Sequence, residues 1–134
     1  MAAIFNSIAN IVRQGDEVVA SCGLYGGTVE LFEDLESFGI TVKYVVDNKP
    51  ECFEGLITDK TRVVFAETIG NPKLDVTDIK AVADVAHAHG IPLIVDNTVS
   101  TPYLIQPITL GADVVVNSTS KYINGNSDAI SGVI

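Results

Sequence analysis

The sequence predicts an α/β fold of three layers, in which helices cover both faces of a mostly parallel β-sheet. Segments with apolar residues at helical spacing alternate along the chain with short β-branched segments. Several β-branched segments are apolar without interruption, which is typical of strands buried on both faces of a parallel sheet. The chain has 134 residues and is 47% hydrophobic, which suits one domain with a substantial core.

The first half of the chain contains two predicted helices. Apolar residues at helical spacing predict a helix over 2–14, ended by Gly15, and a short strand follows over 16–21. A second helix is expected over 26–39, with Thr28 as its N-cap.

The remaining elements continue the alternation. Further strands are expected over 41–46, 61–67, 91–97 and 112–118. The clearest helix covers 76–90, with Thr77 as its expected N-cap. Residues 130–134 resemble a strand with nothing after it, and the N-terminus resembles a cut element. We therefore expect residues 1–134 to be a fragment of a larger enzyme or a natural truncation.

Composition excludes some partners. The formal net charge is -9, which argues against nucleic acids and anionic membranes, because both require clustered Lys and Arg. No apolar segment approaches the ~20 residues of a membrane span, and no secretion signal is visible. Cys22 and Cys52 follow no paired motif. These features predict a cytoplasmic protein with reduced thiols.

Several common motifs are absent or weak. The chain has no dinucleotide fingerprint, P-loop or nucleophile elbow. His87 and His89 are two residues apart on a helix and make a poor metal pair, so no metal site is predicted. Ser118 and Lys121 match the SxxK pattern of serine acyl-transferases, but the other motifs of those enzymes are lacking.

Polar residues follow the predicted strands, where ligands bind in parallel sheets. Asp96 ends one buried strand, and Ser118, Ser120 and Lys121 follow another. Pyridoxal phosphate requires such a set: a lysine for a Schiff base, an acid at the pyridine nitrogen and donors for the phosphate. Tyr25, in a glycine-rich turn, is suited to stack on the ring.

Each of these residues also has an ordinary explanation. Lys121 could be a solvated lysine, Asp96 a turn residue, Tyr25 a surface aromatic residue, and the two serines local caps. Their combination at the expected edge of a parallel sheet favours the cofactor hypothesis.

The segments "LYGGT", "ETIGNPKLDVTDI" and "GIPLIVDNTVSTPYLIQPITLGADVVVNSTSKYINGNSD" resemble the pyridoxal-phosphate enzymes of Cys/Met metabolism. That family includes O-acetylhomoserine sulfhydrylase, cystathionine γ-synthase, cystathionine γ-lyase and methionine γ-lyase. The resemblance covers essentially the whole chain. It implies the large domain of a fold type I pyridoxal-phosphate-dependent transferase, here a partial one.

The resemblance also implies roles for individual residues. Lys121 corresponds to the Schiff-base lysine, Asp96 to the pyridinium partner, and Tyr25 to the stacking ring, with Lys121 and Tyr25 as the catalytic residues. Ser118 and Ser120 correspond to phosphate-binding residues. The remaining cofactor contacts are Asn71, which corresponds to the amide near the phenolic oxygen, and Met1, which corresponds to part of a phosphate-binding turn.

The chain departs from the family pattern in two respects. Gly125-Asn126 stands where the family usually has Gly-His, and the N-terminal arm and C-terminal domain lie outside these residues. The resemblance implies a transferase or lyase that performs γ-replacement or γ-elimination on homoserine-derived amino acids, with a small-molecule sulfur nucleophile as partner. O-acetylhomoserine sulfhydrylase-like chemistry is favoured. The alternatives are a methionine or cystathionine γ-lyase and a catalytically silent domain. A homo-oligomer is expected from the family.

Overall fold

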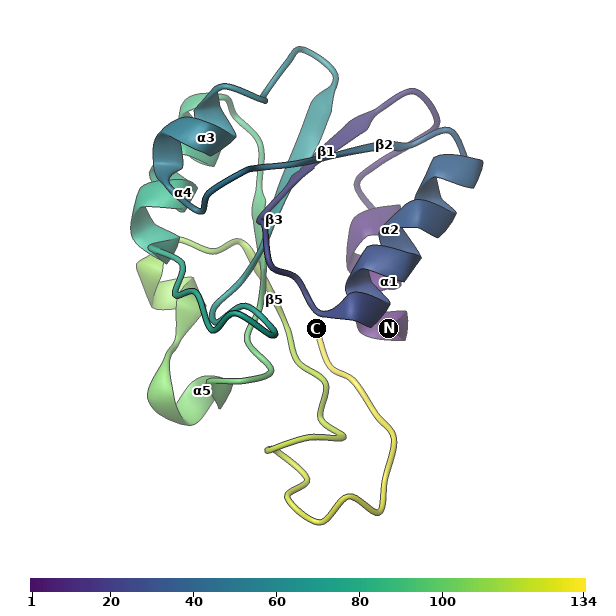
Figure 1. The fold of residues 1–134 in the computed structure, drawn as a ribbon, viewed down its shortest axis with the longest axis vertical. Coiled ribbons are helices and arrows are strands. Elements are labelled where there is room, and N and C mark those ends of the chain that lie inside the picture. The colour runs from purple at the N-terminus through teal and green to yellow at the C-terminus, as the bar shows by residue number, and fades with distance from the viewer.

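A computed structural model describes residues 1–134 and shows five parallel strands in one sheet (Figure 1). Their order across the sheet is β2-β1-β3-β4-β5. The strands are β1 (Glu17–Ala20), β2 (Thr41–Tyr44), β3 (Thr61–Glu67), β4 (Leu93–Asp96) and β5 (Val114–Val116). The predicted α/β class and parallel sheet are confirmed, and the strand predicted over 61–67 matches β3 in full.

Helices cover both faces of this sheet and complete the three predicted layers. Helices α1 (Ala2–Ala9) and α2 (Gly26–Ser37) lie on one face, while α3 (Pro50–Glu54) and α4 (Ile79–Ala88) lie on the other (Figure 1). Two short helices, α5 (Thr101–Leu104) and η1 (Pro107–Leu110), connect β4 to β5. None of the helices is long and apolar enough to cross a bilayer.

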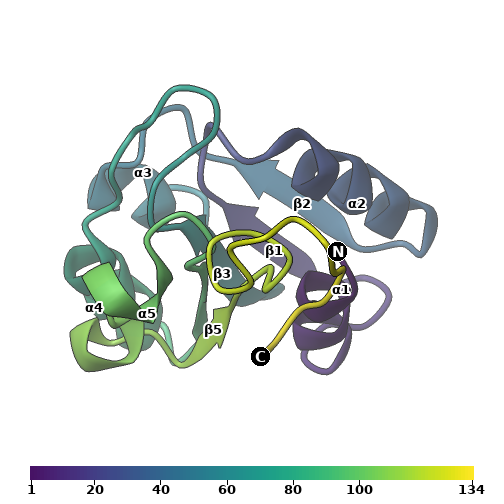
Figure 2. The same ribbon diagram turned by 90° about the horizontal axis from the view of Figure 1, so that it is seen from below.

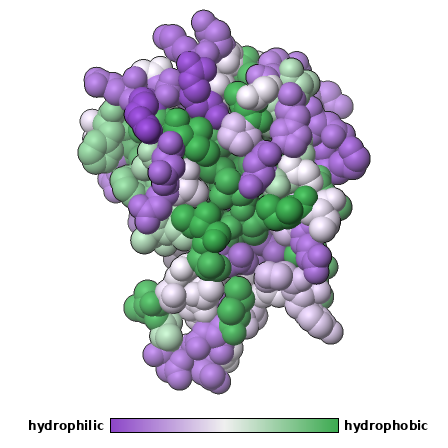
Figure 3. Space-filling view, turned by 180° about the vertical axis from the view of Figure 1, so that it is seen from behind, coloured by the Kyte–Doolittle hydropathy of each residue, from purple (hydrophilic) through white to green (hydrophobic).

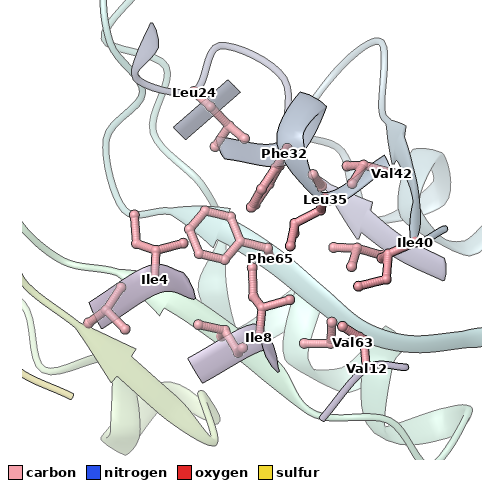
Figure 4. Close-up of a cluster of buried hydrophobic side chains, with 14 residues drawn as sticks. Ile4, Ile8, Val12, Leu24, Phe32, Leu35, Ile40, Val42, Val63 and Phe65 are labelled. Atoms are coloured by element: carbon pink, nitrogen blue, oxygen red, sulfur yellow. The ribbon is translucent and has the colours of Figure 1, made fainter. Parts of the chain in front are cut away.

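The core consists of two apolar clusters separated by the sheet. Successive side chains of a strand point to opposite faces, so Val63 and Phe65 of β3 join the cluster under α1 and α2. Val64 and Ala66 join the cluster under α3 and α4. Figure 4 shows the first cluster, in which Phe65 packs edge-to-face on Phe32 with ring centroids 5.2 Å apart. The uninterrupted apolar strands of the sequence follow from this burial on both faces.

The strand order reverses between β1 and β3. From β1 the chain crosses through α2 to β2 at one edge, and then returns through α3 to β3 on the other side of β1. When two right-handed crossovers run in opposite directions along a sheet, their helices lie on opposite faces, as α2 and α3 do here. Ligands in such sheets bind outside the carboxyl ends of the strands at this switch point, so the loops after β1 and β3 are the first place to look for a site.

The first helix is shorter than predicted. It ends at Ala9 rather than at 14, and Gly15 lies in a later turn with a φ of 90°. The Arg13 N–H donates to Asp16 Oδ2 at 2.8 Å, and the Asp16 N–H donates to the Arg13 carbonyl at 3.0 Å. A local turn of this kind competes with helix extension and directs the chain into β1.

Both predicted N-caps are wrong, each for a structural reason. Tyr25 occupies the N-cap of α2, and Thr28 lies fully buried inside the helix. Asp78 caps α4 by accepting the Ala81 N–H at 3.1 Å. The Thr77 hydroxyl instead donates to the Glu67 carbonyl at 2.7 Å and ties the segment before α4 to the end of β3.

The strand predicted over 130–134 is reduced to one antiparallel bridge. Asn117 and Val133 exchange two backbone hydrogen bonds of 3.0 Å. This segment returns to the neighbourhood of α1 (Figures 1 and 2). The approach is close, since a Cβ on Gly132 would lie 3.2 Å from the Ala3 Cβ. The short elements α3, α5 and η1 were not predicted, since each is too short for a helical repeat of apolar residues and all three begin at or beside a proline.

Removing the Phe65 ring should destabilise the fold strongly. The ring is 0% exposed, so Phe65→Ala should lower the free energy of unfolding by about 3–5 kcal/mol. Phe38 is 62% exposed, and Phe38→Ala should change it by no more than about 0.5 kcal/mol. Urea denaturation of the two variants provides the measurement, and equal effects would contradict the assigned core.

Candidate active site

A cleft of about 1440 Å³ opens at the carboxyl edge of the sheet. Figure 2 looks onto this edge, with the segment after β5 in front. The loops that follow β1, β3, β4 and β5 contribute to the lining, together with the start of α1. All seven predicted site residues line this one cleft: Met1, Tyr25, Asn71, Asp96, Ser118, Ser120 and Lys121. Residues up to 120 positions apart in the sequence thus meet at one edge.

Asp96 is the last residue of β4 and stands between the core and the cleft. Its Oδ1 accepts the Thr98 N–H at 2.8 Å and the Thr98 hydroxyl at 2.5 Å. No protein donor reaches Oδ2, which leaves that oxygen free for a donor in the cleft. Burial raises the pKa of Asp96, and the two bonds from Thr98 oppose that rise.

Thr98 was not predicted from the sequence, and it joins two parts of the cleft. Its hydroxyl donates to Asp96 and also accepts the Ser118 N–H at 2.7 Å. The loop after β4 is therefore fixed to the loop after β5. The only signal for this role in the sequence is a threonine two residues after a strand-ending acid, which is too common a pattern to be selected alone.

Lys121 lies in a turn after β5 and is exposed. Its N–H donates to the Ser118 carbonyl at 3.3 Å, and its own carbonyl accepts the Gly125 N–H at 2.8 Å. No hydrogen bond joins the Lys121 amine to a serine hydroxyl, so the structure offers no support for a serine–lysine catalytic pair.

The two predicted serines differ in availability. The Ser118 hydroxyl makes no hydrogen bond within the protein. The Ser120 hydroxyl donates to the Ser131 carbonyl at 3.1 Å and accepts the Ser131 N–H at 2.8 Å. Ser118 is therefore free to bind a ligand, whereas Ser120 must first exchange its bonds to Ser131.

Tyr25 forms the N-cap of α2 and is 50% exposed toward solvent. Its ring lies beside Gly27, where a Cβ would be only 2.8 Å from the Tyr25 Cε1. The same position would be 3.5 Å from the sulfur of Met1. The absence of a side chain at Gly27 thus leaves the space that the tyrosine ring uses.

Asn71 belongs to the loop after β3 and is held against the loop after β1. Its N–H donates to the Gly23 carbonyl at 2.8 Å. A Cβ on Gly70 would come within 2.8 Å of that same oxygen, so only glycine permits the close approach of the two loops. The Asn71 side chain makes no hydrogen bond within the protein.

Glu67 is a further buried acid at this edge that was not predicted as a site residue. It ends β3 directly opposite Asp96 in the parallel register and is 6% exposed. Its Oε1 accepts the Tyr25 N–H at 2.9 Å. Burial raises the pKa of Glu67 to about 7, the bond from Tyr25 opposes the rise, and the nearby Asp96 adds to it. The sequence carried the same signal as for Asp96, an acid at the end of an apolar strand.

The two histidines lie outside the cleft. His87 pairs with Asp113 and His89 with Glu54, each at 2.9 Å. No group of three or more His, Cys, Asp or Glu side chains is arranged to hold a metal ion.

The chain is similar to known proteins over its whole length. The family model described as Cys/Met metabolism PLP-dependent enzyme matches residues 1–134. An O-acetyl-L-homoserine sulfhydrylase from Leptospira meyeri is 47% identical over 96% of this chain and 29% of its own length. An L-methionine gamma-lyase from Porphyromonas gingivalis is 44% identical over 100% of this chain and 34% of its own length.

A solved structure is similar in both sequence and fold. It is that of a putative O-acetylhomoserine (thiol)-lyase from Campylobacter jejuni, which contains a pyridoxyl-lysine monophosphate. The TM-score is 0.94 and the identity 38%, over 98% of this chain and 33% of that one. The chain spans about a third of the length of the curated relatives that it matches. A family match over every residue, supported by this likeness in fold, shows that the chain belongs to the Cys/Met-metabolism family of PLP-dependent enzymes.

Proposed function

We propose that the whole protein is a pyridoxal-phosphate-dependent enzyme that replaces or eliminates the γ-substituent of homoserine-derived amino acids. An O-acetylhomoserine sulfhydrylase-like reaction is the best supported, because two of the similar proteins with the highest identity carry that name. Its partners are then an amino-acid substrate and a small sulfur nucleophile. The observation that carries the proposal is the cleft that Lys121 shares with Asp96.

The polar atoms that the cleft leaves without partners match the groups of the cofactor. Asp96 Oδ2 is available for a protonated ring nitrogen, and the Ser118 hydroxyl for a phosphate. Two further buried oxygens on the lining, Thr28 Oγ1 and Asn117 Oδ1, have no hydrogen-bond partner. Buried polar atoms are normally paired, so unpaired ones around a cleft support a polar ligand. The residues present fit pyridoxal phosphate.

Each residue has a distinct task in this proposal. When bound, pyridoxal phosphate supplies an electron sink for bond breaking at the carbons of an amino acid. Asp96 Oδ2 holds the proton on the ring nitrogen, and the positive charge there stabilises the ionised carboxylate against the effect of burial. Lys121 Nζ would hold the cofactor in place, and as a free amine it would accept the proton that leaves the substrate Cα. Tyr25 covers one face of the ring.

A second candidate reaction is the γ-elimination of methionine or cystathionine. It is favoured by the similarity to the L-methionine gamma-lyase, which is nearly as strong as that to the sulfhydrylases. The same cleft residues serve either reaction, since both begin with proton removal at Cα. A third possibility, a catalytically silent domain, differs from both in binding the cofactor without turning over a substrate.

The whole protein is further proposed to be a cytoplasmic homo-oligomer. Support for self-association comes from large apolar side chains on the surface, which Figure 3 shows gathered in the middle of one face. Over the whole surface rather than within that patch, the exposed large apolar side chains include Tyr103 at 92% and Leu104 at 70%. Surfaces of this kind commonly mark interfaces. Support for the location comes from Cys22 and Cys52, which are both free thiols.

Lys121→Ala should abolish covalent retention of the cofactor. The 134-residue chain is incubated with pyridoxal phosphate and reduced with borohydride, and mass spectrometry locates the modified residue. Modification is expected at Lys121 alone, with loss of the visible absorbance in the variant. Lys73→Ala serves as the control, since Lys73 does not line the cleft. Modification spread over several lysines, or none, would contradict the assigned role, and retention without turnover of O-acetylhomoserine and sulfide would favour a silent domain.

Asp96→Asn should weaken cofactor binding by roughly ten- to a hundredfold, because a hydrogen bond to a charged group contributes about 1.5–3 kcal/mol. The neutral amide keeps the size of the side chain but no longer stabilises a protonated ring nitrogen. The dissociation constant is measured by titration of absorbance or fluorescence. Asp59→Asn, an exposed acid outside the cleft, should leave it unchanged. Equal affinity in both variants would remove Asp96 from the binding site.

A further inference from the structure

The position of Tyr25 depends on a contact that the proposed mechanism does not use. Within the protein, the Tyr25 side chain makes no hydrogen bond of its own. Its backbone N–H donates to Glu67 Oε1 at 2.9 Å, across 42 positions of sequence. This is the only hydrogen bond that the Glu67 side chain accepts. The buried acid therefore links the end of β3 to the first residue of the α2 cap.

The Tyr25 turn is confined from two sides. On one side, Glu67 accepts the hydrogen bond from the backbone N–H of Tyr25. On the other side, the ring lies so close to Gly27 that a Cβ there would be only 2.8 Å from it. A carboxylate at the amino end of a helix is also favoured by the helix dipole, and α2 is 12 residues long. A buried acid is costly unless it is paired, so an uncharged residue would fill this place more cheaply if packing were its only task.

We propose that Glu67 is a positioning residue of the candidate active site, which holds the Tyr25 turn so that the tyrosine ring lies at the cleft. Glu67 does not touch the reacting atoms and acts through Tyr25. The inference rests on the proposed function for its consequence, which is cofactor affinity. The contact itself is independent of that function and can be tested without cofactor.

The ionisation of Glu67 gives the contact a pH dependence. The groups that face its carboxyl group are the Tyr25 N–H from the cap of α2 and the Asp96 carboxylate from β4. The pKa of Glu67 is raised to about 7, mainly by burial. An ionised carboxylate accepts a stronger hydrogen bond than a protonated one, so Tyr25 is held more firmly as the pH rises through 7.

The first test measures the Tyr25 amide in the 134-residue chain by NMR, with no cofactor added. Its proton shift should titrate with a midpoint near 7, the pKa of Glu67. In Glu67→Gln, which keeps an acceptor oxygen, that titration should be absent while the amide stays protected from exchange. In Glu67→Met, which removes the acceptor, exchange should be faster by about tenfold or more. An amide that neither titrates near 7 nor responds to Glu67→Met would overturn the proposal.

The second test measures pyridoxal-phosphate affinity in a double-mutant cycle. Glu67→Met should weaken binding by about tenfold when Tyr25 is present, and by much less in a Tyr25→Ala background. Glu67→Gln should restore most of the affinity. Equal losses in both backgrounds would mean that Glu67 acts independently of Tyr25 and would overturn the positioning role. If the chain without substitutions binds no cofactor, the proposed function fails. The amide measurement alone then shows whether Glu67 holds the Tyr25 turn.

A matched pair of glycine variants tests the other side of the turn. Gly27→Ala places a Cβ 2.8 Å from the Tyr25 ring and should displace it, with weaker cofactor binding. Gly26→Ala adds the same methyl group where no atom lies within 4 Å and should leave binding unchanged. Both substitutions favour the helix, so helix stability does not explain a difference between them. Equal cofactor affinities of the two variants would show that the position of the Tyr25 ring beside Gly27 does not affect cofactor binding.

Discussion

The parallel pairing of β1, β3, β4 and β5 is the constraint on which the rest of the structure depends. Parallel strands place all of their carboxyl ends at one edge, and here the register sets Glu67 directly beside Asp96. Because both faces of the sheet are buried, the strands contain almost only apolar residues until that edge. Polar groups are therefore concentrated where four loops meet, and the cleft follows from the fold.

The loops at this edge are fixed to one another by a few polar contacts. The Thr98 hydroxyl joins the loops after β4 and β5, the Asn71 N–H joins the loops after β3 and β1, and Glu67 joins β3 to α2. Each contact spans strands that are adjacent in the sheet or meet at the switch point. A site assembled from four separate loops thus keeps a defined geometry, although loops are usually the more mobile parts of a fold.

Much of this organisation could be predicted from the sequence, and the failures have physical causes. Apolar strands and strong helical periodicity gave the class of the fold and all five strands. Asp96 and Lys121 were predicted to lie at one edge of the sheet because each follows or ends a buried strand, and both line the cleft. The cap of α2 was wrong because Tyr25 is held by an acid 42 residues away, and the cap of α4 was wrong because the Thr77 hydroxyl donates to the Glu67 carbonyl and leaves the cap to Asp78. Glu67 carried the same local signal as Asp96, but its partner Tyr25 is set by tertiary structure, and the contact of Thr98 with Ser118 is likewise visible only in the fold.

The two acids at the edge differ in what their surroundings do to them. Asp96 accepts two hydrogen bonds on one oxygen and retains a free oxygen beside the cleft, whereas Glu67 accepts one bond from the backbone of Tyr25. Because like charges on neighbouring strands repel, ionisation of one acid raises the pKa of the other. A positive group bound at Asp96 would offset the charge of that carboxylate and so reduce its repulsion of an ionised Glu67. Binding at the sheet edge and placement of the tyrosine ring are in this way linked through a single pair of carboxyl groups.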